Sequence, residues 1–111
     1  MKQLFEYIPS NCLVGHTHVP GVFTDEPDFY GSEDMDDAKW KITGDDKCII
    51  NPGSVGQPRD LDPRASYAIL DSEAKDVEFF RLEYDIESVV QKIYAIPELT
   101  NWLGDRLREG R

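Results

Sequence analysis

Two stretches decide the fold: Leu13-Val14-Gly15-His16-Thr17-His18-Val19-Pro20 and Ile49-Ile50-Asn51-Pro52-Gly53-Ser54-Val55-Gly56-Gln57-Pro58-Arg59. Each begins with a short apolar run, which is typical of a buried strand. Each then passes into a loop that contains glycine and proline. We therefore expect buried strands at residues 12–15 and 48–50, each followed by a loop with polar side chains.

Further strands are expected on both sides of these two. Residues 22–23 begin one, and residues 66–71 and 77–84 read as a hairpin because a polar five-residue segment separates them. In the second hairpin strand Phe80, Leu82 and Tyr84 alternate with charged residues, so we expect them on its buried face.

Helical patterns lie at both ends. Residues 1–8 resemble the tail of an amphipathic helix, which leads us to expect further polypeptide upstream. Near the other end Asp85 predicts an N-cap for a helix over residues 86–93, and Pro97 the first turn of a second helix capped by Gly110. Mixed strands followed by helices predict an α/β (α+β) layered fold, in one domain over residues 1–111.

Composition excludes several classes of function. The net charge of −10 over 111 residues disfavours binding to nucleic acid or to an anionic membrane surface. No secretion signal or run of roughly 20 apolar residues appears, so we expect a cytoplasmic protein. Cys12 and Cys48 adjoin apolar residues and are predicted to be reduced, although a disulfide is an alternative.

Residues 24–46 form an acidic segment that we expect to be an insertion loop, with a strand at residues 39–43. Its Asp34-Met35-Asp36-Asp37 run lacks the glycine and the terminal glutamate of a calcium-binding loop. A solvated acidic loop is therefore the better interpretation.

His16 and His18 are the candidate metal ligands. In an extended segment residues two apart point to the same side, so both imidazoles could reach one metal, or one each of two metals. Gly15 would let the backbone approach closely. The alternative is a pair of ordinary surface or hydrogen-bonded histidines.

The loop after the second strand has its own two interpretations. Asn51, Gly53 and Ser54 belong to a tight turn whose exposed backbone N–H groups can contact an anion or pack beside a metal site. The alternative is a plain turn.

Together, the two motifs resemble the C-terminal part of the calcineurin-like metallophosphoesterases, most closely their small prokaryotic phosphodiesterase branch. The resemblance implies a sandwich of two mixed sheets flanked by helices, and metal-assisted hydrolysis of a phosphodiester or phosphomonoester. It implies that His16 binds the second metal and His18 the first, with Gly15, Asn51, Gly53 and Ser54 near the site. It also makes Arg59 a possible phosphate contact. The metal would be Mn, Fe, Zn or Ni, which imidazole ligands do not distinguish.

The other motifs of that family are missing from the chain: Asp-x-His, Gly-Asp, Gly-Asn-His and one further histidine, which all precede Gly-His-x-His. We therefore expect no hydrolysis by the chain alone, and a homodimer through the face that the missing half would cover. Three interpretations stay open: part of a phosphodiesterase, a non-catalytic dimerising or partner-binding remnant, and one chain of a split enzyme.

Overall fold

The structure is a computed structural model that describes residues 2–111. Its elements are seven strands, three short 3-10 turns and two α-helices: η1 Lys2–Glu6, β1 Cys12–Leu13, β2 Gly21–Thr24, β3 Phe29–Tyr30, η2 Ser32–Asp34, η3 Asp36–Ala38, β4 Lys39–Lys41, β5 Cys48–Asn51, β6 Ala65–Asp71, β7 Asp76–Leu82, α1 Ile86–Tyr94 and α2 Trp102–Glu109.

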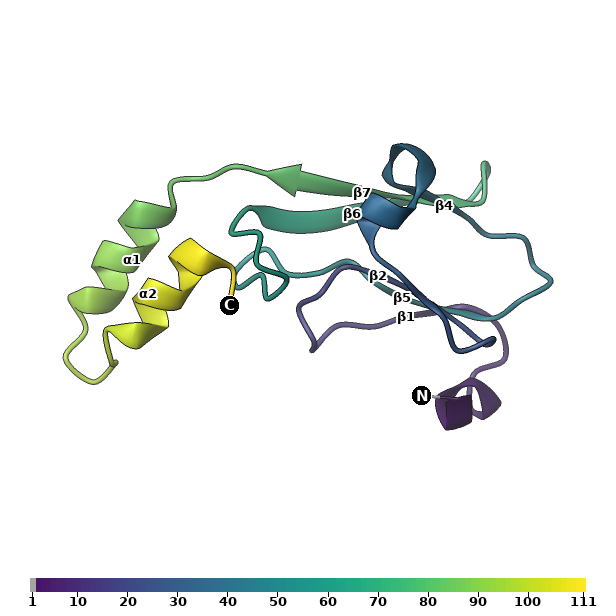
Figure 1. Ribbon diagram of the computed structural model, residues 1–111, viewed down its shortest axis with the longest axis horizontal. Helices are drawn as coiled ribbons and strands as arrows, with labels where there is room; N and C mark the ends of the chain where they lie inside the picture. The colour runs from purple at the N-terminus through teal and green to yellow at the C-terminus, as the bar shows by residue number, and fades with distance from the viewer. Residues whose placement is uncertain (1) are drawn as a thin grey trace.

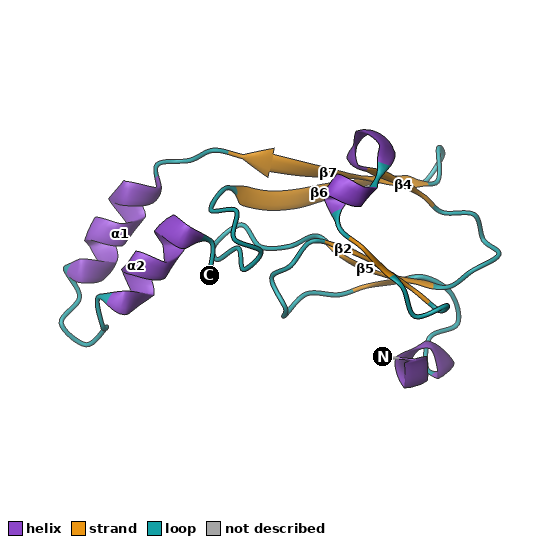
Figure 2. Ribbon diagram, in the orientation of Figure 1, coloured by secondary structure: helices purple, strands orange, loops and turns teal. Residues whose placement is uncertain are grey.

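The strands form two sheets, as expected for an α+β layered fold (Figures 1 and 2). The first has the order β1-β5-β2-β3, with β1 and β5 parallel and the other pairs antiparallel. The second is antiparallel and has the order β4-β7-β6. The predicted strand at residues 22–23 and the predicted hairpin are present as β2 and as β6–β7.

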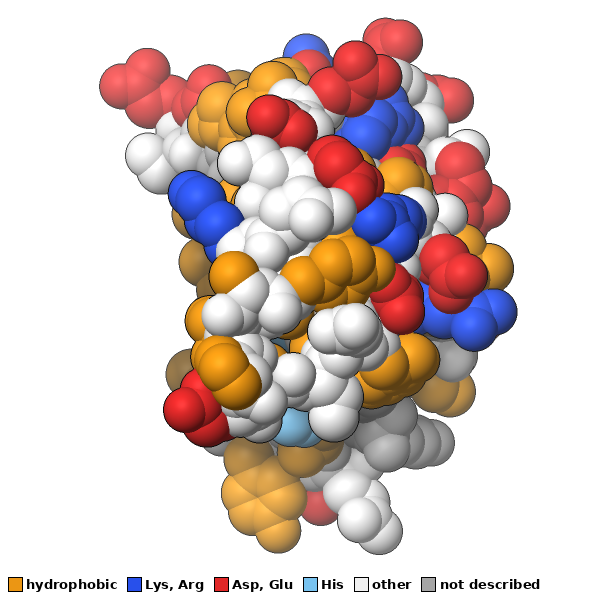
Figure 3. Space-filling view, turned by 90° about the vertical axis from the view of Figure 1, so that its left-hand side faces the viewer, with side chains coloured by type: hydrophobic (Ala, Val, Ile, Leu, Met, Phe, Trp, Pro, Cys, Tyr) orange, Lys and Arg blue, Asp and Glu red, His pale blue; other side chains and the backbone are white. Residues whose placement is uncertain are grey.

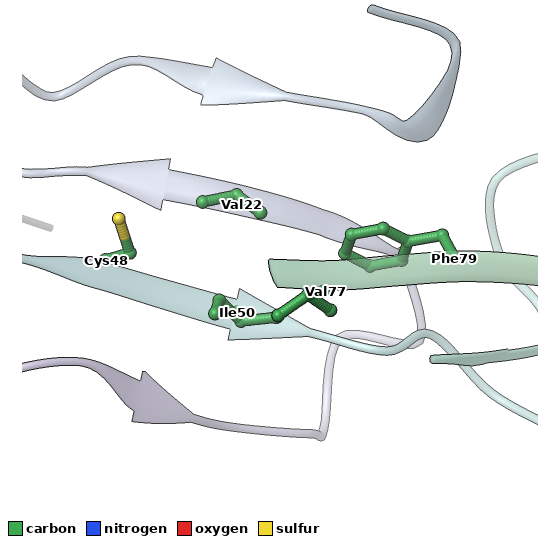
Figure 4. Close-up of a cluster of buried hydrophobic side chains, with 5 residues drawn as sticks. All are labelled: Val22, Cys48, Ile50, Val77 and Phe79. Carbon is green, nitrogen blue, oxygen red and sulfur yellow. The ribbon is translucent and has the colours of Figure 1, made fainter. Parts of the chain in front are cut away.

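The core lies between the two sheets. Its centre is a cluster of buried side chains from β2, β5 and β7, which point toward one another in Figure 4: Val22, Cys48, Ile50, Val77 and Phe79. Every residue of β5 is buried, as its apolar run predicts. Burial raises the pKa of the Cys48 thiol, and both cysteines are free.

The predicted buried face of β7 is wrong. Val77 and Phe79 face the core, whereas Leu82 is 57% exposed and Phe80 stacks on Tyr67 of the neighbouring strand. Both faces of this strand carry apolar residues, so alternation alone does not choose between them. The packing of Val77 and Phe79 against β2 and β5 decides the register.

The N-terminal third also differs from expectation. Residues 2–6 form a 3-10 turn rather than the tail of an α-helix, and Met1 lies outside the described residues. The strand β1 is not buried: it has two residues, and Leu13 is 62% exposed because β1 is the edge of its sheet. The acidic segment holds the strand expected at residues 39–43, as β4 over Lys39–Lys41, and in addition β3 and two 3-10 turns.

The two helices form a hairpin at one end of the molecule (Figure 1). The predicted cap holds at α1, where the Asp85 carboxylate accepts a hydrogen bond from the Ser88 N–H at 3.1 Å. The second helix begins at Trp102 and not at Pro97, since residues 97–100 form a turn. Gly110 is its left-handed C-cap, as expected, and its carbonyl accepts from the Leu61 N–H. Within residues 2–111, neither helix is long and apolar enough to cross a bilayer.

One side of the sandwich is open. There the edge strands β1 and β6 flank a cavity of about 140 Å3 whose lining is entirely apolar: Leu13, Ile50, Pro52, Ala68, Leu70 and Val77. Leu70 is 48% exposed at its rim. Because β1 and β6 are paired on one side only, this opening also presents unpaired backbone groups.

Candidate metal centre

The two predicted loops meet at one edge of the first sheet. Parallel strands end at the same edge, and β1 pairs with β5 in register Cys12 to Ile49 and Leu13 to Ile50. The Val14 N–H continues the pairing by donating to the Ile50 carbonyl at 2.9 Å. The histidine loop after β1 and the Asn51 loop after β5 therefore begin side by side.

His16 lies at the centre of a tight turn. The Thr17 N–H donates to the Gly15 carbonyl, two residues earlier, at 3.1 Å, and His16 has a φ of 82°. This combination is typical of a γ-turn of the rarer, strained kind. His18 also has a positive φ, of 63°. Left-handed conformations cost a non-glycine residue roughly 1–3 kcal/mol and cluster at functional sites, although Asp37, Ala38, Leu61 and Lys75 of this chain also have a positive φ.

The extended geometry expected for the two histidines is therefore wrong. Residues 16–17 form a bend, and the two side chains are set by the turn and not by strand alternation. His16 is exposed and His18 is half-buried. Nothing in the structure lies within 4 Å of where a Gly15 Cβ would be, so the close approach expected at Gly15 stays a prediction.

Asn51 joins the two loops. Its side chain is buried, at 2% exposure, and its amide nitrogen donates to the Gly15 carbonyl at 3.2 Å and to Thr17 Oγ1 at 2.8 Å. Its amide oxygen accepts from the Gly53 N–H at 2.9 Å. The amide therefore holds the residues on both sides of His16 and closes its own loop at the same time.

His18 is oriented by the same loop. Its Nδ1 lies 2.8 Å from the Gln57 carbonyl oxygen. A carbonyl only accepts, so Nδ1 carries a proton, and in the neutral ring Nε2 then keeps its lone pair. A histidine that donates one ring nitrogen to a backbone carbonyl while the other is free is the usual arrangement of a metal ligand. The His18 carbonyl in turn accepts from the Arg59 N–H at 3.2 Å.

The turn at Gly53 needs glycine. Its φ is 87°, and a Cβ there would lie 2.5 Å from Ser66 Oγ and 3.1 Å from Pro20. Ser66 is buried and donates to the Pro52 carbonyl at 2.8 Å, while its N–H donates to the Ser54 carbonyl. Ser54 Oγ accepts from the Gln57 N–H at 2.9 Å. The Gly53 and Ser54 side of the loop thus rests on β6.

The predicted phosphate contact, Arg59, is exposed, and its guanidinium donates to Gln57 Oε1 at 3.3 Å. A second basic group lies deeper. Arg81 of β7 is ion-paired with Asp60 and lines, with Val19 and Pro20, a cavity of about 400 Å3. Burial lowers the pKa of Arg81, yet the guanidinium stays protonated because its ordinary pKa is so high.

The two imidazoles fit as part of a ligand set. His18 has the donor arrangement of a ligand, and His16 is exposed on an ordered turn two residues away. Within residues 2–111, however, no group of three or more His, Cys, Asp or Glu side chains comes together as a metal site. Catalytic zinc ordinarily has three protein ligands, so these residues alone do not complete a catalytic centre.

Sequence reasoning missed the residues that orient the histidines. Thr17 Oγ1 contacts Asn51, which is 34 residues away in sequence, and the Gln57 carbonyl contacts His18, which is 39 residues away. Every residue has a backbone carbonyl, so residue type gives no sign of such a contact. The Asn-Pro-Gly-Ser loop lies against the histidine loop through the bonds from Asn51 to Gly15 and Thr17, which the sequence did not predict.

Figure 3 views the end formed by the helices, where apolar and charged side chains mix and an imidazole is visible.

No protein-family model matches the sequence. An uncharacterised protein of Methanocaldococcus jannaschii is 44% identical over 99 residues, which cover 89% of this chain and 39% of that protein. The crystal structure of a metallophosphoesterase from Sphaerobacter thermophilus is similar with a TM-score of 0.85 and 36% identity, over 96% of this chain and 45% of that one.

The chain therefore has the fold of part of a metallophosphoesterase. It spans less than half the length of both proteins. Metallophosphoesterases as a class depend on a divalent metal.

Proposed function

We propose that this chain is the part of a metal-dependent phosphoesterase that supplies two imidazole ligands, His16 and His18, to its metal centre. The observation that carries the proposal is the bond from His18 Nδ1 to the Gln57 carbonyl, which leaves Nε2 free in a fold similar to a metallophosphoesterase. The reaction would be hydrolysis of a phosphodiester or phosphomonoester.

Divalent Mn, Fe, Zn or Ni would suit these imidazoles. Such ions polarise a phosphoryl oxygen and make water a better nucleophile when bound. This chain's own contribution is to hold His18 in one tautomer and His16 on a fixed turn. Arg59, whose backbone N–H donates to the His18 carbonyl, would offer positive charge near the site from its exposed side chain.

The isolated chain would be inactive under this proposal. Two imidazoles leave the centre short of ligands, and polypeptide equivalent to the remainder of the Sphaerobacter protein would provide the others. That remainder makes up 55% of the solved chain, since 45% is covered here.

A chimera tests the proposal. The uncovered part of the Sphaerobacter metallophosphoesterase would be joined to this chain and assayed with Mn2+ and a chromogenic phosphodiester. We expect metal-dependent turnover that His18→Ala abolishes, with His18→Ala folded as judged by circular dichroism, and none from the 111-residue chain alone. A folded chimera that binds metal yet turns over nothing, or turnover that survives His18→Ala, would overturn the proposal.

A non-catalytic module that dimerises or binds a partner is the second candidate. The observation in its favour is the open apolar cavity between β1 and β6. The same chimera separates the two, because a remnant selected only for association has no reason to keep histidines that support turnover.

A further inference from the structure

The Asn51 side-chain amide makes three hydrogen bonds at a buried position. Both of its N–H donors are used, on the Gly15 carbonyl and on Thr17 Oγ1, and its oxygen accepts from the Gly53 N–H. The orientation of the amide is unambiguous, because a backbone carbonyl only accepts and a backbone N–H only donates. These contacts join the end of β5 to the turn after β1.

The residues that Asn51 holds are the immediate neighbours of His16. The turn at His16 is strained, with a φ of 82°, and its internal bond from Thr17 to Gly15 spans a single residue. A strained turn persists only when its surroundings hold it. Here the holding groups are the two donors of Asn51, one on each side of His16.

The same loop also reaches His18, since the Gln57 carbonyl accepts from its Nδ1. One segment, residues 51–57, therefore controls both histidines: Asn51 through the backbone around His16, and Gln57 through the ring of His18. The bond to Gly53 closes the loop of Asn51 itself, whereas the bonds to Gly15 and Thr17 reach the other loop.

We propose that Asn51 is the positioning residue of the histidine pair, acting through Gly15 and Thr17 to fix the turn that presents His16 beside His18. The inference rests on the proposed metal-binding function for its purpose, but the positioning itself is measurable without metal. Removal of groups that orient metal ligands typically weakens metal binding by roughly 10- to 100-fold.

The experiment compares four variants of the 111-residue chain. Asn51→Ala removes all three hydrogen bonds of the amide. Thr17→Val removes only the hydroxyl that accepts one of them, at an exposed position. Thr17→Ser keeps the hydroxyl and serves as the conservative variant. Asn11→Ala is the matched control, because Asn11 Oδ1 accepts from the Cys48 N–H at the other end of β5 and is remote from the turn. Two quantities are measured: 15N backbone order parameters of residues 16–18 without metal, and the Zn2+ dissociation constant.

In the wild type, Thr17→Ser and Asn11→Ala, we expect order parameters near the rigid value of about 0.85. In Thr17→Val and Asn51→Ala those of residues 16 and 17 should fall toward about 0.6, with Zn2+ bound roughly 10-fold more weakly or worse. Unchanged order parameters in folded Thr17→Val and Asn51→Ala would overturn the inference. If Asn51→Ala does not fold, Thr17→Val decides. A rigid wild type that binds no Zn2+ would instead contradict the proposed function.

Discussion

His18 Nδ1 and the Gln57 carbonyl oxygen are 2.8 Å apart, and this single bond determines which nitrogen of His18 can meet a metal. It links the loop after β1 to the loop after β5, so the tautomer of one side chain depends on the pairing of two strands. The proton is on Nδ1 because the partner is a backbone carbonyl.

The first prediction follows from that bond. At pH 8.5, where an ordinary imidazole is neutral, long-range 15N–1H spectra should show His18 protonated at Nδ1 and unprotonated at Nε2. Zinc should then shift the Nε2 resonance. A neutral His18 with the proton on Nε2 would contradict the orientation on which the proposed site depends.

Alanine substitutions at three glycines distinguish the cost of backbone strain from the cost of steric contact. Gly53→Ala should lower the free energy of unfolding by about 2 kcal/mol or more, because its φ is 87° and its Cβ would meet Ser66 at 2.5 Å. Gly44→Ala, with a φ of 84° and open space, should cost about 1 kcal/mol. Gly56→Ala, with neither feature, should change it by less than about 0.5 kcal/mol.

Urea unfolding followed by circular dichroism measures all three. Equal effects of Gly53→Ala and Gly56→Ala would mean that the loop does not rest on β6 as described.

The helix hairpin has a pH-sensitive ion pair. Arg108 donates from Nε at 2.9 Å and from Nη2 at 2.6 Å to the Glu87 carboxylate, which lowers the pKa of Glu87 from 4.5 to about 2. Because the folded pKa is the lower one, the pair stabilises the fold above pH 4.5, and its contribution is lost as pH falls from there toward 2. Both groups are exposed, so the effect on stability is small.

An NMR titration of the Glu87 side-chain carboxyl measures this pKa directly. We expect about 2 in the wild type and a rise toward 4.5 in Arg108→Gln. Arg106→Gln is the control, since Arg106 lies over the Trp102 ring instead. A Glu87 pKa that is unchanged in Arg108→Gln would show that the contact between Arg108 and Glu87 does not persist in solution.

The open side of the sandwich predicts self-association of the 111-residue chain. The cavity between β1 and β6 is apolar and lies beside unpaired strand edges, and a two-fold dimer would cover both. Leu70→Lys should produce monomers in light scattering, because it places a charge at the rim. Ile96→Lys, at an exposed apolar residue in the helix hairpin, should not. A monomeric wild type at moderate concentration would rule the dimer out.

A short apolar run predicts a strand here but not its burial. Residues 48–50 are buried as β5, as expected, whereas the similar run at residues 12–15 gives the exposed edge strand β1. The hairpin β6–β7 follows from the polar turn between two apolar segments. The face of β7 does not follow, because Phe80 and Leu82 are as apolar as Val77 and Phe79, and only the opposite sheet distinguishes them.

The candidate site, like the fold, was only partly predictable from the sequence. Residue types and their order predict that His16, His18 and Asn51 belong to one site, and in the structure the Asn51 amide bonds to Gly15 and Thr17 on the two sides of His16. The γ-turn at His16 was out of reach, because it depends on a hydrogen bond between Asn51 and Thr17 that no local pattern encodes. The late start of α2 was also missed, since Pro97 opens a turn here instead of the helix.

Calorimetric titration of the 111-residue chain with Mn2+ and Zn2+, beside His16→Ala, His18→Ala and the double variant, measures whether His16 and His18 bind a metal. We expect binding in the wild type, weaker than at a complete three-ligand site, that either single substitution weakens and the double substitution abolishes. Metal bound equally well by the double variant, or no binding by a folded wild type, would contradict this expectation.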